Sequence, residues 1–238
     1  MSRRGFFITG TDTDAGKTLV TAALLLKAQQ SGLACLGLKP VAAGCDYRNG
    51  QWLNSDALLH QQYSNPPLRY ELHNPVALPG AIAPHIAAAQ QQQSLSVSRL
   101  MSLCTPALNS AELVFTEGAG GWLVPLNDEE TMADLARAIG DPVILVVGMK
   151  LGCINHALLT ATAIRASGLP LAGWVANHLP PGMNAAHENL AFLRHWFNQQ
   201  NVPLLGSIPI LSNLNASDPQ QLAHIATQLI LPKSTEPD

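Results

Sequence analysis

The apolar residues of the chain gather in short, nearly continuous runs, and most of these runs are separated by longer segments with helical spacing. Apolar runs without alternating polar residues indicate strands that are buried on both faces. Six such strands are predicted, at Phe6–Thr9, Leu33–Leu38, Leu113–Thr116, Val143–Val147, Leu171–Ala176 and Leu204–Ile208. Helices are predicted notably at Lys17–Gln30, Met132–Ile139, Asn155–Ser167 and Ala185–Gln199. This alternation predicts an α/β fold, with a mostly parallel central sheet flanked by helices on both faces.

Length and composition favour one globular domain. The chain has 238 residues, of which 47% are hydrophobic and only 12% charged, which excludes a disordered protein. We expect the domain to span residues 1–230, with the proline-rich region 65–90 as an excursion from the core. The polar residues 231–238 are expected to form a disordered tail.

The charge pattern argues against nucleic acid and membrane partners. The net charge is −3 and the 13 basic residues are scattered, so no basic stripe is present. The apolar run that follows Arg3 and Arg4 is too short for a signal peptide, and no stretch has the length of a membrane span. The four cysteines include no Cys-x-x-Cys pair, so we expect reduced thiols and a cytoplasmic protein.

A glycine-rich turn joins the first predicted strand to the first predicted helix and ends in Gly16-Lys17-Thr18. Backbone N–H groups in such a turn converge on an anion, and the helix N-terminus adds positive partial charge. Lys17 would reach the outer phosphates of a nucleotide, and the Thr18 hydroxyl would bind Mg²⁺. Thr11 stands where the motif usually has its first glycine. An ordinary strand-to-helix turn is the alternative, but the lysine–threonine pair between a strand and a helix favours a P-loop NTPase-like fold.

Further charged residues follow other predicted strands. Lys39 and Glu117 come directly after the second and third strands, and Asp56 opens a helix. Taken alone, Asp56 fits the first turn of a helix as well as it fits a metal ligand. The carboxyl ends of parallel strands meet at one edge of a sheet, so we expect these groups to lie together. Thr18, Asp56 and Glu117 are therefore predicted to hold Mg²⁺, with Lys17 and Lys39 neutralising phosphate charge.

The eight histidines are too dispersed for a compact metal motif, and no His-Glu-x-x-His sequence occurs. A structural role is expected for His156, with an indirect role near the substrate left open, and the same holds for His85. Glycines at 118, 120 and 121 do not form a dinucleotide-binding fingerprint, so nicotinamide and flavin cofactors are disfavoured.

Taken in chain order, several motifs resemble those of the dethiobiotin synthetase family. They are Gly10–Thr18, Lys39-Pro40-Val41, Asn54-Ser55-Asp56, Glu117–Gly121 and Gly152–His156, and the later segments Gly173–Asn177 and Leu204–Pro209 fit as well. The similarity runs from the N-terminus to about residue 211. Many ATPases share the phosphate loop, but the whole set is specific.

The resemblance implies an ATP-dependent carboxylation that uses Mg²⁺. The family joins 7,8-diaminononanoate with CO₂ to form a carbamate, which ATP phosphorylates to a carbamic–phosphoric anhydride. The second amine then closes the ureido ring and releases phosphate. A homodimer is also implied, in which the helix start at residues 152–155 binds the substrate carboxylate of the partner subunit's site.

By the same resemblance, individual residues receive roles. Catalysis is implied for Lys39, Lys17 and Thr13. ATP binding is implied for Asp14, Ala15, Gly16, Lys17, Thr18, Glu117, Gly118, Ala119, Gly120, Asn177, Pro209, Ile210 and Leu211. Substrate contacts are implied for Ala43, Gly152, Cys153, Ile154, Asn155 and Asn189. A nucleophilic Cys153 is disfavoured, because this chemistry needs no covalent enzyme intermediate.

Three positions depart from the family pattern. Ala43 replaces a serine or threonine, Asn189 stands where some members have a tyrosine, and Asp14 replaces a glutamate. A relative of the family acting on another diamine is therefore an alternative. A partition-type ATPase switch of the same fold is another, although such proteins carry a lysine where this chain has Asp12. ATP-dependent amidation enzymes usually carry a glutaminase domain, for which this chain has no room.

Overall fold

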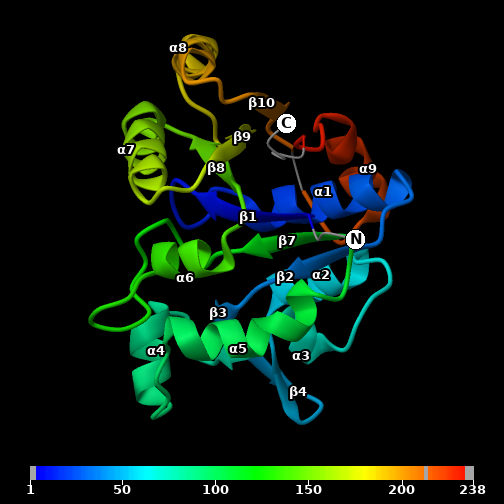
Figure 1. Ribbon diagram of the computed structural model, residues 1–238. Coiled ribbons are helices and arrows are strands. Elements are labelled where there is room, and N and C mark those ends of the chain that lie inside the picture. The colour runs from blue at the N-terminus through cyan, green and yellow to red at the C-terminus, as the bar shows by residue number, and fades with distance from the viewer. Residues whose placement is uncertain (1–3, 212–213, 234–238) are drawn as a thin grey trace.

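A six-stranded parallel sheet forms the centre of the computed structural model, which describes residues 4–211 and 214–233 (Figure 1). Its strands are β1 (Arg4–Gly10), β2 (Cys35–Leu38), β7 (Leu113–Glu117), β8 (Val143–Met149), β9 (Leu171–His178) and β10 (Leu204–Ile208), in the order β10-β9-β8-β1-β7-β2. Every neighbouring pair in this sheet is parallel. The six predicted strands and the α/β class are thus confirmed.

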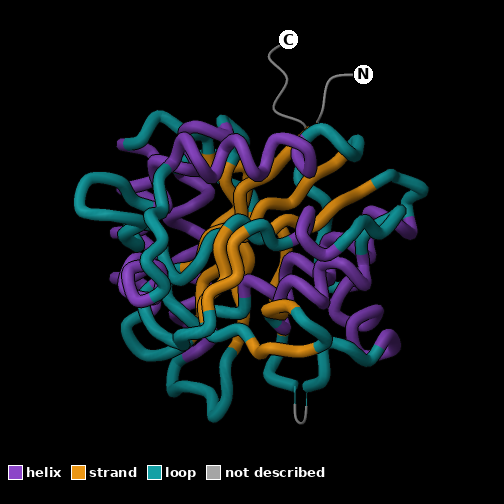
Figure 2. Tube along the Cα trace, turned by 90° about the horizontal axis from the view of Figure 1, so that it is seen from below, coloured by secondary structure: helices purple, strands orange, loops and turns teal. Residues whose placement is uncertain are grey.

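Helices cover both faces of the sheet, and the strands lie between them in Figure 2. One face packs against α1 (Lys17–Gln30), α2 (Ser55–Tyr63) and α9 (Pro219–Thr227), the other against α5 (Val97–Leu108), α6 (Met132–Ile139), α7 (Cys153–Ala166) and α8 (Ala186–Gln199). Within β1, Phe6 and Ile8 point to the first face and Phe7 to the second. Because both faces are buried, the middle of the strand is apolar at three consecutive positions, Phe6 to Ile8, instead of at every second one.

Most predicted boundaries agree with the structure, and the differences lie at glycine turns and loop ends. Helices α1 and α6 begin and end at the predicted residues. The strand predicted from Leu33 begins at Cys35, because the turn through Gly32 (φ +78°) follows directly after α1. Helix α7 begins at Cys153 instead of Asn155, directly after the left-handed Gly152.

The region between β2 and α5 adds short elements at one end of the sheet. Strands β3 (Val41–Ala43) and β6 (Val76–Leu78) pair in parallel, and β4 (Asp46–Arg48) and β5 (Gln51–Leu53) form an antiparallel hairpin. The remaining elements are α3 (Tyr70–His73) and α4 (Pro84–Gln90). Buried side chains of β6 and α4 join the main core, so the proline-rich region 65–90 packs against the domain.

Three further expectations concern the C-terminal tail, the cysteines and membrane-spanning segments. The predicted tail, residues 231–238, lies outside the described residues from 234 onward. All four cysteines are free and buried. Within residues 4–211 and 214–233, no helix has the length and apolarity needed to cross a lipid bilayer.

The strand order places the phosphate loop at the middle of the sheet. β1 lies between β7 and β8, and Ile8 of β1 is in register with Glu117 at the end of β7. The loop that leaves β1 therefore starts beside the carboxyl ends of its neighbours, which is where parallel α/β sheets bind ligands.

Candidate active site

The glycine-rich loop between β1 and α1 is held in place by hydrogen bonds with strands β8 and β9. The side-chain amide of Asn177, at the end of β9, donates to the carbonyl of Ala15 at 3.0 Å. Thr11 accepts a hydrogen bond from the backbone N–H of Gly148 at 3.3 Å. Gly16 has φ +93°, and a Cβ there would lie 2.1 Å from the Asn177 amide nitrogen. Glycine at position 16 is thus required by both the backbone conformation and the packing.

Thr11, at the position where the motif usually has a glycine, has a structural explanation. Its hydroxyl forms one of the two hydrogen bonds that hold the loop against the sheet. Next to it, the carboxylate of Asp12 pairs with Lys150, which follows β8. This hydrogen bond with Lys150 lowers the pKa of Asp12 below its ordinary value. Lys150 therefore holds the loop and lies apart from the other charged residues of the strand ends.

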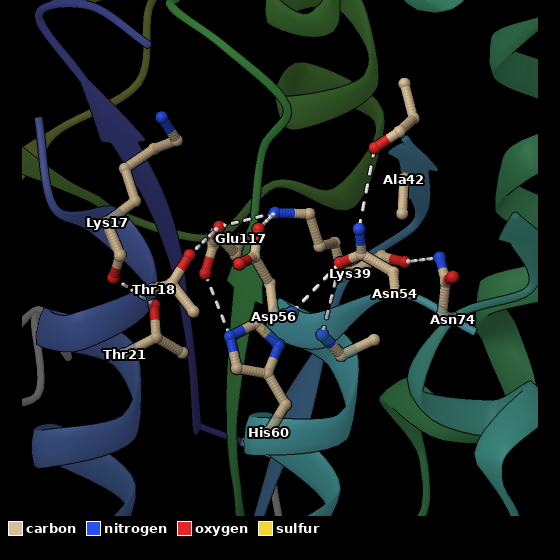
Figure 3. Close-up of polar contacts among 12 residues, drawn as sticks. Lys17, Thr18, Thr21, Lys39, Ala42, Asn54, Asp56, His60, Asn74 and Glu117 are labelled. Atoms are coloured by element: carbon tan, nitrogen blue, oxygen red, sulfur yellow. Dashed lines mark hydrogen bonds and ion pairs between the residues drawn. The ribbon is translucent and has the colours of Figure 1, made fainter. Parts of the chain in front are cut away.

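Lys39, Asp56 and Glu117 form one cluster, in which Lys39 and Glu117 are buried and Asp56 is half-buried, and their side chains point toward each other in Figure 3. The Lys39 ammonium contacts a carboxylate oxygen of Asp56 and lies 2.7 Å from Oε1 of Glu117. Thr18 donates its hydroxyl hydrogen to that same Oε1 at 3.0 Å. Three segments, from β2, α2 and β7, thus converge on the first turn of α1.

Opposite charges in this cluster stabilise each other's ionised forms. Burial alone would raise the pKa of Glu117, but the charges of Lys39, His60 and Lys17 outweigh it and hold the pKa well below its usual range. Burial alone would lower the pKa of Lys39, but Glu117 and Asp56 raise it above its ordinary value. Lys17 differs, because burial lowers its pKa and the charge of Lys39 adds to that effect. Lys39 is therefore a permanent cation.

His60 completes the cluster, a contact that the sequence did not predict. The ring is fully buried, and its Nε2 lies 2.8 Å from Oε2 of Glu117. Among the described residues its Nδ1 has no hydrogen-bond partner. The available signal was the spacing of Asp56 and His60, four residues apart on α2, which puts both on one helix face. His60 orients the second carboxylate oxygen, so that the first faces Thr18 and Lys39.

The donor set fits a magnesium ion bound together with phosphate. Thr18 Oγ1 and the carboxylates of Asp56 and Glu117 lie close together. The Lys39 ammonium pairs with both carboxylates and neutralises their charge. Within the described ranges, no cluster of three or more His, Cys, Asp and Glu side chains forms a complete metal cage. Mg²⁺ is commonly held by one or two carboxylates, with water and nucleotide phosphates as its other ligands.

A pocket of about 990 Å³ opens above this cluster. Its walls include most of the residues predicted for phosphate, metal and catalysis, together with Ala43, which was predicted to contact the substrate. The former are Thr13, Asp14, Gly16, Lys17, Thr18, Lys39, Asp56, Glu117, Ala119 and Gly120. Residues that the sequence did not point to, from Ala81 to Pro84 and at Val124 and Pro125, form an apolar wall on one side. Such a cavity accommodates a charged phosphate tail beside an apolar substrate chain.

Other predicted residues do not line this pocket. Asn177 is buried, and its side-chain amide donates to the loop carbonyl of Ala15. Residues 209–211 follow β10. The segment 152–155 opens α7, directly after the 89% exposed side chain of Leu151. Asn189 lies beside it, with Oδ1 3.9 Å from the sulfur of Cys153. The expected substrate-carboxylate residues thus form a second group, separate from the phosphate pocket of the same chain.

Comparisons with known proteins identify the family. Residues 4–218 match the model of a family described as an AAA domain. The chain is 56% identical over 216 residues to the ATP-dependent dethiobiotin synthetase BioD of Cellvibrio japonicus, covering 91% of this chain and 93% of the relative. It is 46% identical over 220 residues to the enzyme of that name from Aromatoleum aromaticum, covering 92% and 95%. The chain belongs to the dethiobiotin synthetase family.

Solved structures support the fold of this dethiobiotin synthetase family member. The cell division ATPase MinD from Pyrococcus furiosus aligns with a TM-score of 0.53 at 16% identity, covering 96% of this chain and 98% of that one. The septum site-determining protein MinD from Pyrococcus horikoshii, complexed with Mg-ADP, has a TM-score of 0.51 at 18% identity and covers 94% and 86%. At this identity the likeness shows a shared P-loop NTPase-like fold and nothing about function.

Proposed function

We propose that this protein carboxylates 7,8-diaminononanoate with CO₂ and closes the ureido ring of dethiobiotin, converting ATP to ADP and phosphate. Family membership supports the activity. The single structural observation that carries the proposal is the charged cluster of Lys39, Asp56 and Glu117 beside the phosphate loop. A switch ATPase needs to bind and hydrolyse a nucleotide, whereas this reaction also needs cationic charge for a second anion next to the γ-phosphate.

The proposed chemistry has three balanced steps. One amine of the substrate attacks CO₂, loses a proton and becomes a carbamate. A carbamate oxygen then attacks the γ-phosphorus, the bond to ADP breaks, and a carbamic–phosphoric anhydride forms. Finally the second amine attacks the carbonyl carbon, loses a proton, closes the ring and expels inorganic phosphate. The second step brings two anions together, so its barrier depends on positive charge in the pocket.

The lysines of the pocket match this requirement. Lys17 begins α1 under the loop, where it would contact the outer phosphates, while Lys39 would face the carbamate and the transferring phosphoryl group. Thr13 and Asp14 line the same wall. Glu117 and Asp56 raise the pKa of Lys39, which supports a role for Lys39 as a cation.

Mg²⁺ would be held by Thr18, Asp56 and Glu117, and it would neutralise phosphate oxygens during the transfer. Asn177 and residues 209–211 are assigned to the adenine, with Gly118, Ala119 and Gly120 near the nucleotide. The amide nitrogen of Asn177 donates to the carbonyl of Ala15, and its side-chain oxygen would accept a hydrogen bond from the base.

A homodimer with shared sites completes the proposal. Gly152, Cys153, Ile154 and Asn155 form a helix start, where free N–H groups suit a carboxylate, yet they do not line the pocket of their own chain. The neighbouring Leu151, Leu159 and Phe192 are exposed apolar side chains. A second copy placed against this surface would bring its pocket to the helix start. Burial raises the pKa of Cys153, which supports a packing role for the thiol and argues against a nucleophile.

The reaction itself is the test of this proposal. The protein is incubated with ATP, Mg²⁺, labelled bicarbonate and 7,8-diaminononanoate, and label is sought in the ring product. ADP formation that requires both the diamine and bicarbonate is the expected result. ADP formation that ignores the diamine but rises with DNA or lipid would support a partition-type switch, and turnover with another diamine alone would support a paralogue.

The departure at Ala43 yields a second prediction. Ala43 lines the pocket at the end of β3, where a serine hydroxyl would face the diamine. A new hydrogen bond contributes about 0.5–1.5 kcal/mol, so Ala43→Ser should lower the KM for the diamine by roughly 2- to 12-fold. The KM for ATP, measured on the same variant, should stay constant and serves as the control. An unchanged diamine KM would show that the missing hydroxyl does not matter.

A further inference from the structure

Lys39 and Asp56, which pair in the cluster, come from different elements. Both are connected by hydrogen bonds to the short helix α3 and to Asn74, the residue that follows it. Lys39 follows β2, and its backbone N–H donates to the carbonyl of His73 at 2.7 Å. Its own carbonyl accepts from the side chain of Asn74 at 2.8 Å. Asn74 directly follows α3, so this helix end holds the main chain of Lys39 on both sides.

Asp56 is placed by Asn54, which caps α2. The Asn54 side-chain oxygen accepts from the backbone N–H groups of Asp56 at 3.1 Å and Ala57 at 3.4 Å. An asparagine at this position satisfies N–H groups that the helix itself leaves free. The position of the Asp56 main chain therefore depends on where Asn54 is held.

Tyr70 joins these two supports. Its hydroxyl oxygen accepts the backbone N–H of Asn54 at 2.8 Å and donates its hydrogen to Oδ1 of Asn74 at 2.9 Å. The chain of donors thus runs from Asn54 through Tyr70 to Asn74 and on to the carbonyl of Lys39. The ion pair of Lys39 with Asp56 closes it into a ring.

The uncharged members of this ring are buried. Tyr70, Asn54 and Asn74 are 7%, 6% and 3% exposed, so water does not readily replace a lost partner. Burial also raises the pKa of Tyr70 to about 12. The phenol keeps its hydrogen at neutral pH and remains both the acceptor and the donor that the ring requires.

We propose that Tyr70 is a positioning residue, whose hydroxyl sets the distance between the Lys39 ammonium and the Asp56 carboxylate and thereby prepares the site for Mg²⁺ and the transferring phosphoryl group. It acts through Asn54 and Asn74 and touches no reactant. The inference rests on the proposed function for its effect on turnover. Its effect on nucleotide binding does not depend on the identity of the diamine.

The test compares Tyr70→Phe with Tyr63→Phe. Tyr63 is also buried, at 5% exposure, and lies on α2, but its hydroxyl has no hydrogen-bond partner among the described residues. ATP binding is measured by calorimetry with and without Mg²⁺, together with steady-state kinetics and Tm. Tyr70→Phe should lower kcat about tenfold and raise the Mg²⁺ concentration for half-maximal ATP binding about tenfold, while ATP affinity without Mg²⁺ stays within about twofold. Tyr63→Phe should leave all of these values within about twofold.

A structural role alone would give a different result. If Tyr70→Phe lowers Tm but leaves kcat and the Mg²⁺ dependence equal to those of Tyr63→Phe, the positioning role is wrong. Equal losses of ATP affinity with and without Mg²⁺ would also overturn it. If the wild-type protein makes no dethiobiotin, the proposed function fails, and the Mg²⁺ dependence of ATP binding still decides the role of Tyr70.

Discussion

Replacing Lys39 by alanine should lower kcat by about 10²- to 10³-fold and change the Kd for ATP by no more than about threefold. The reason is that the Lys39 charge matters most when the carbamate and the γ-phosphoryl group meet, a contact that does not exist in the ATP complex. Pre-steady-state measurement of ADP formation, with ATP binding followed by calorimetry, separates the two effects. Lys39 also neutralises two carboxylates, so Mg²⁺ should raise the Tm of the variant more than that of the wild type.

Two further lysine variants make this prediction specific. Lys17→Ala should weaken ATP binding as well as turnover, because Lys17 begins α1 within the phosphate loop. Lys39→Arg keeps a cation near Asp56 and Glu117 and should recover part of the lost rate. Equal losses in binding and turnover for Lys39→Ala would contradict the assigned role.

Glu117→Gln should have the largest effect on stability. The Glu117 carboxylate is fully buried and meets Lys39, His60 and Thr18 at 2.7, 2.8 and 3.0 Å. A glutamine amide has one oxygen instead of two, and it leaves the buried lysine with less compensating charge. Breaking a buried ion pair costs about 3–5 kcal/mol, so the free energy of unfolding at pH 7 should fall by roughly that amount. Urea denaturation followed by circular dichroism measures it.

An exposed residue of the same type provides the control. Glu112 immediately precedes β7, and its carboxylate accepts one hydrogen bond, from the backbone N–H of Ala34. Glu112→Gln should change the free energy of unfolding by no more than about 0.5–1 kcal/mol. Similar losses in the free energy of unfolding for both variants would show that Glu117 contributes no more to stability than an exposed glutamate does.

The pH dependence of the Glu117→Gln effect follows from the direction of the pKa shift. The pKa of Glu117 is lowered on folding, so its contribution is complete above the unfolded-state pKa of about 4.3. The difference between wild type and variant should therefore be constant from pH 7 to about pH 5. It should then shrink as the pH falls below about 4, because the unfolded carboxyl takes up a proton while the folded one stays ionised.

The sheet and the phosphate end of the site could be predicted because their signals are local. Doubly buried strands are apolar at every position, and the turn ending in Gly16-Lys17-Thr18 carries its chemistry in consecutive residues. Lys39 and Glu117 follow apolar strands directly, so the rule that strand ends converge was enough to bring them together.

The supports of the site could not be predicted in this way. His60 meets Glu117 across 57 residues of sequence, and Tyr70 meets Asn54 across 16. Strands β3 to β6 have three residues each, too few to show a period. Helix α5 contains Pro106, which normally argues against a helix, and it was not predicted. Contacts of this kind depend on tertiary packing, which a single sequence does not display.

The bond between the Asn177 side chain and the Ala15 carbonyl links two ends of the nucleotide site mechanically. The loop that would bind the triphosphate and the strand end that would meet the purine share one amide, and Gly16 lies directly under it. A side chain introduced at position 16 would push on Asn177 as well as distort the turn. Under the proposed assignment of Asn177 to the base, a change at this hydrogen bond would alter phosphate affinity and base selectivity together.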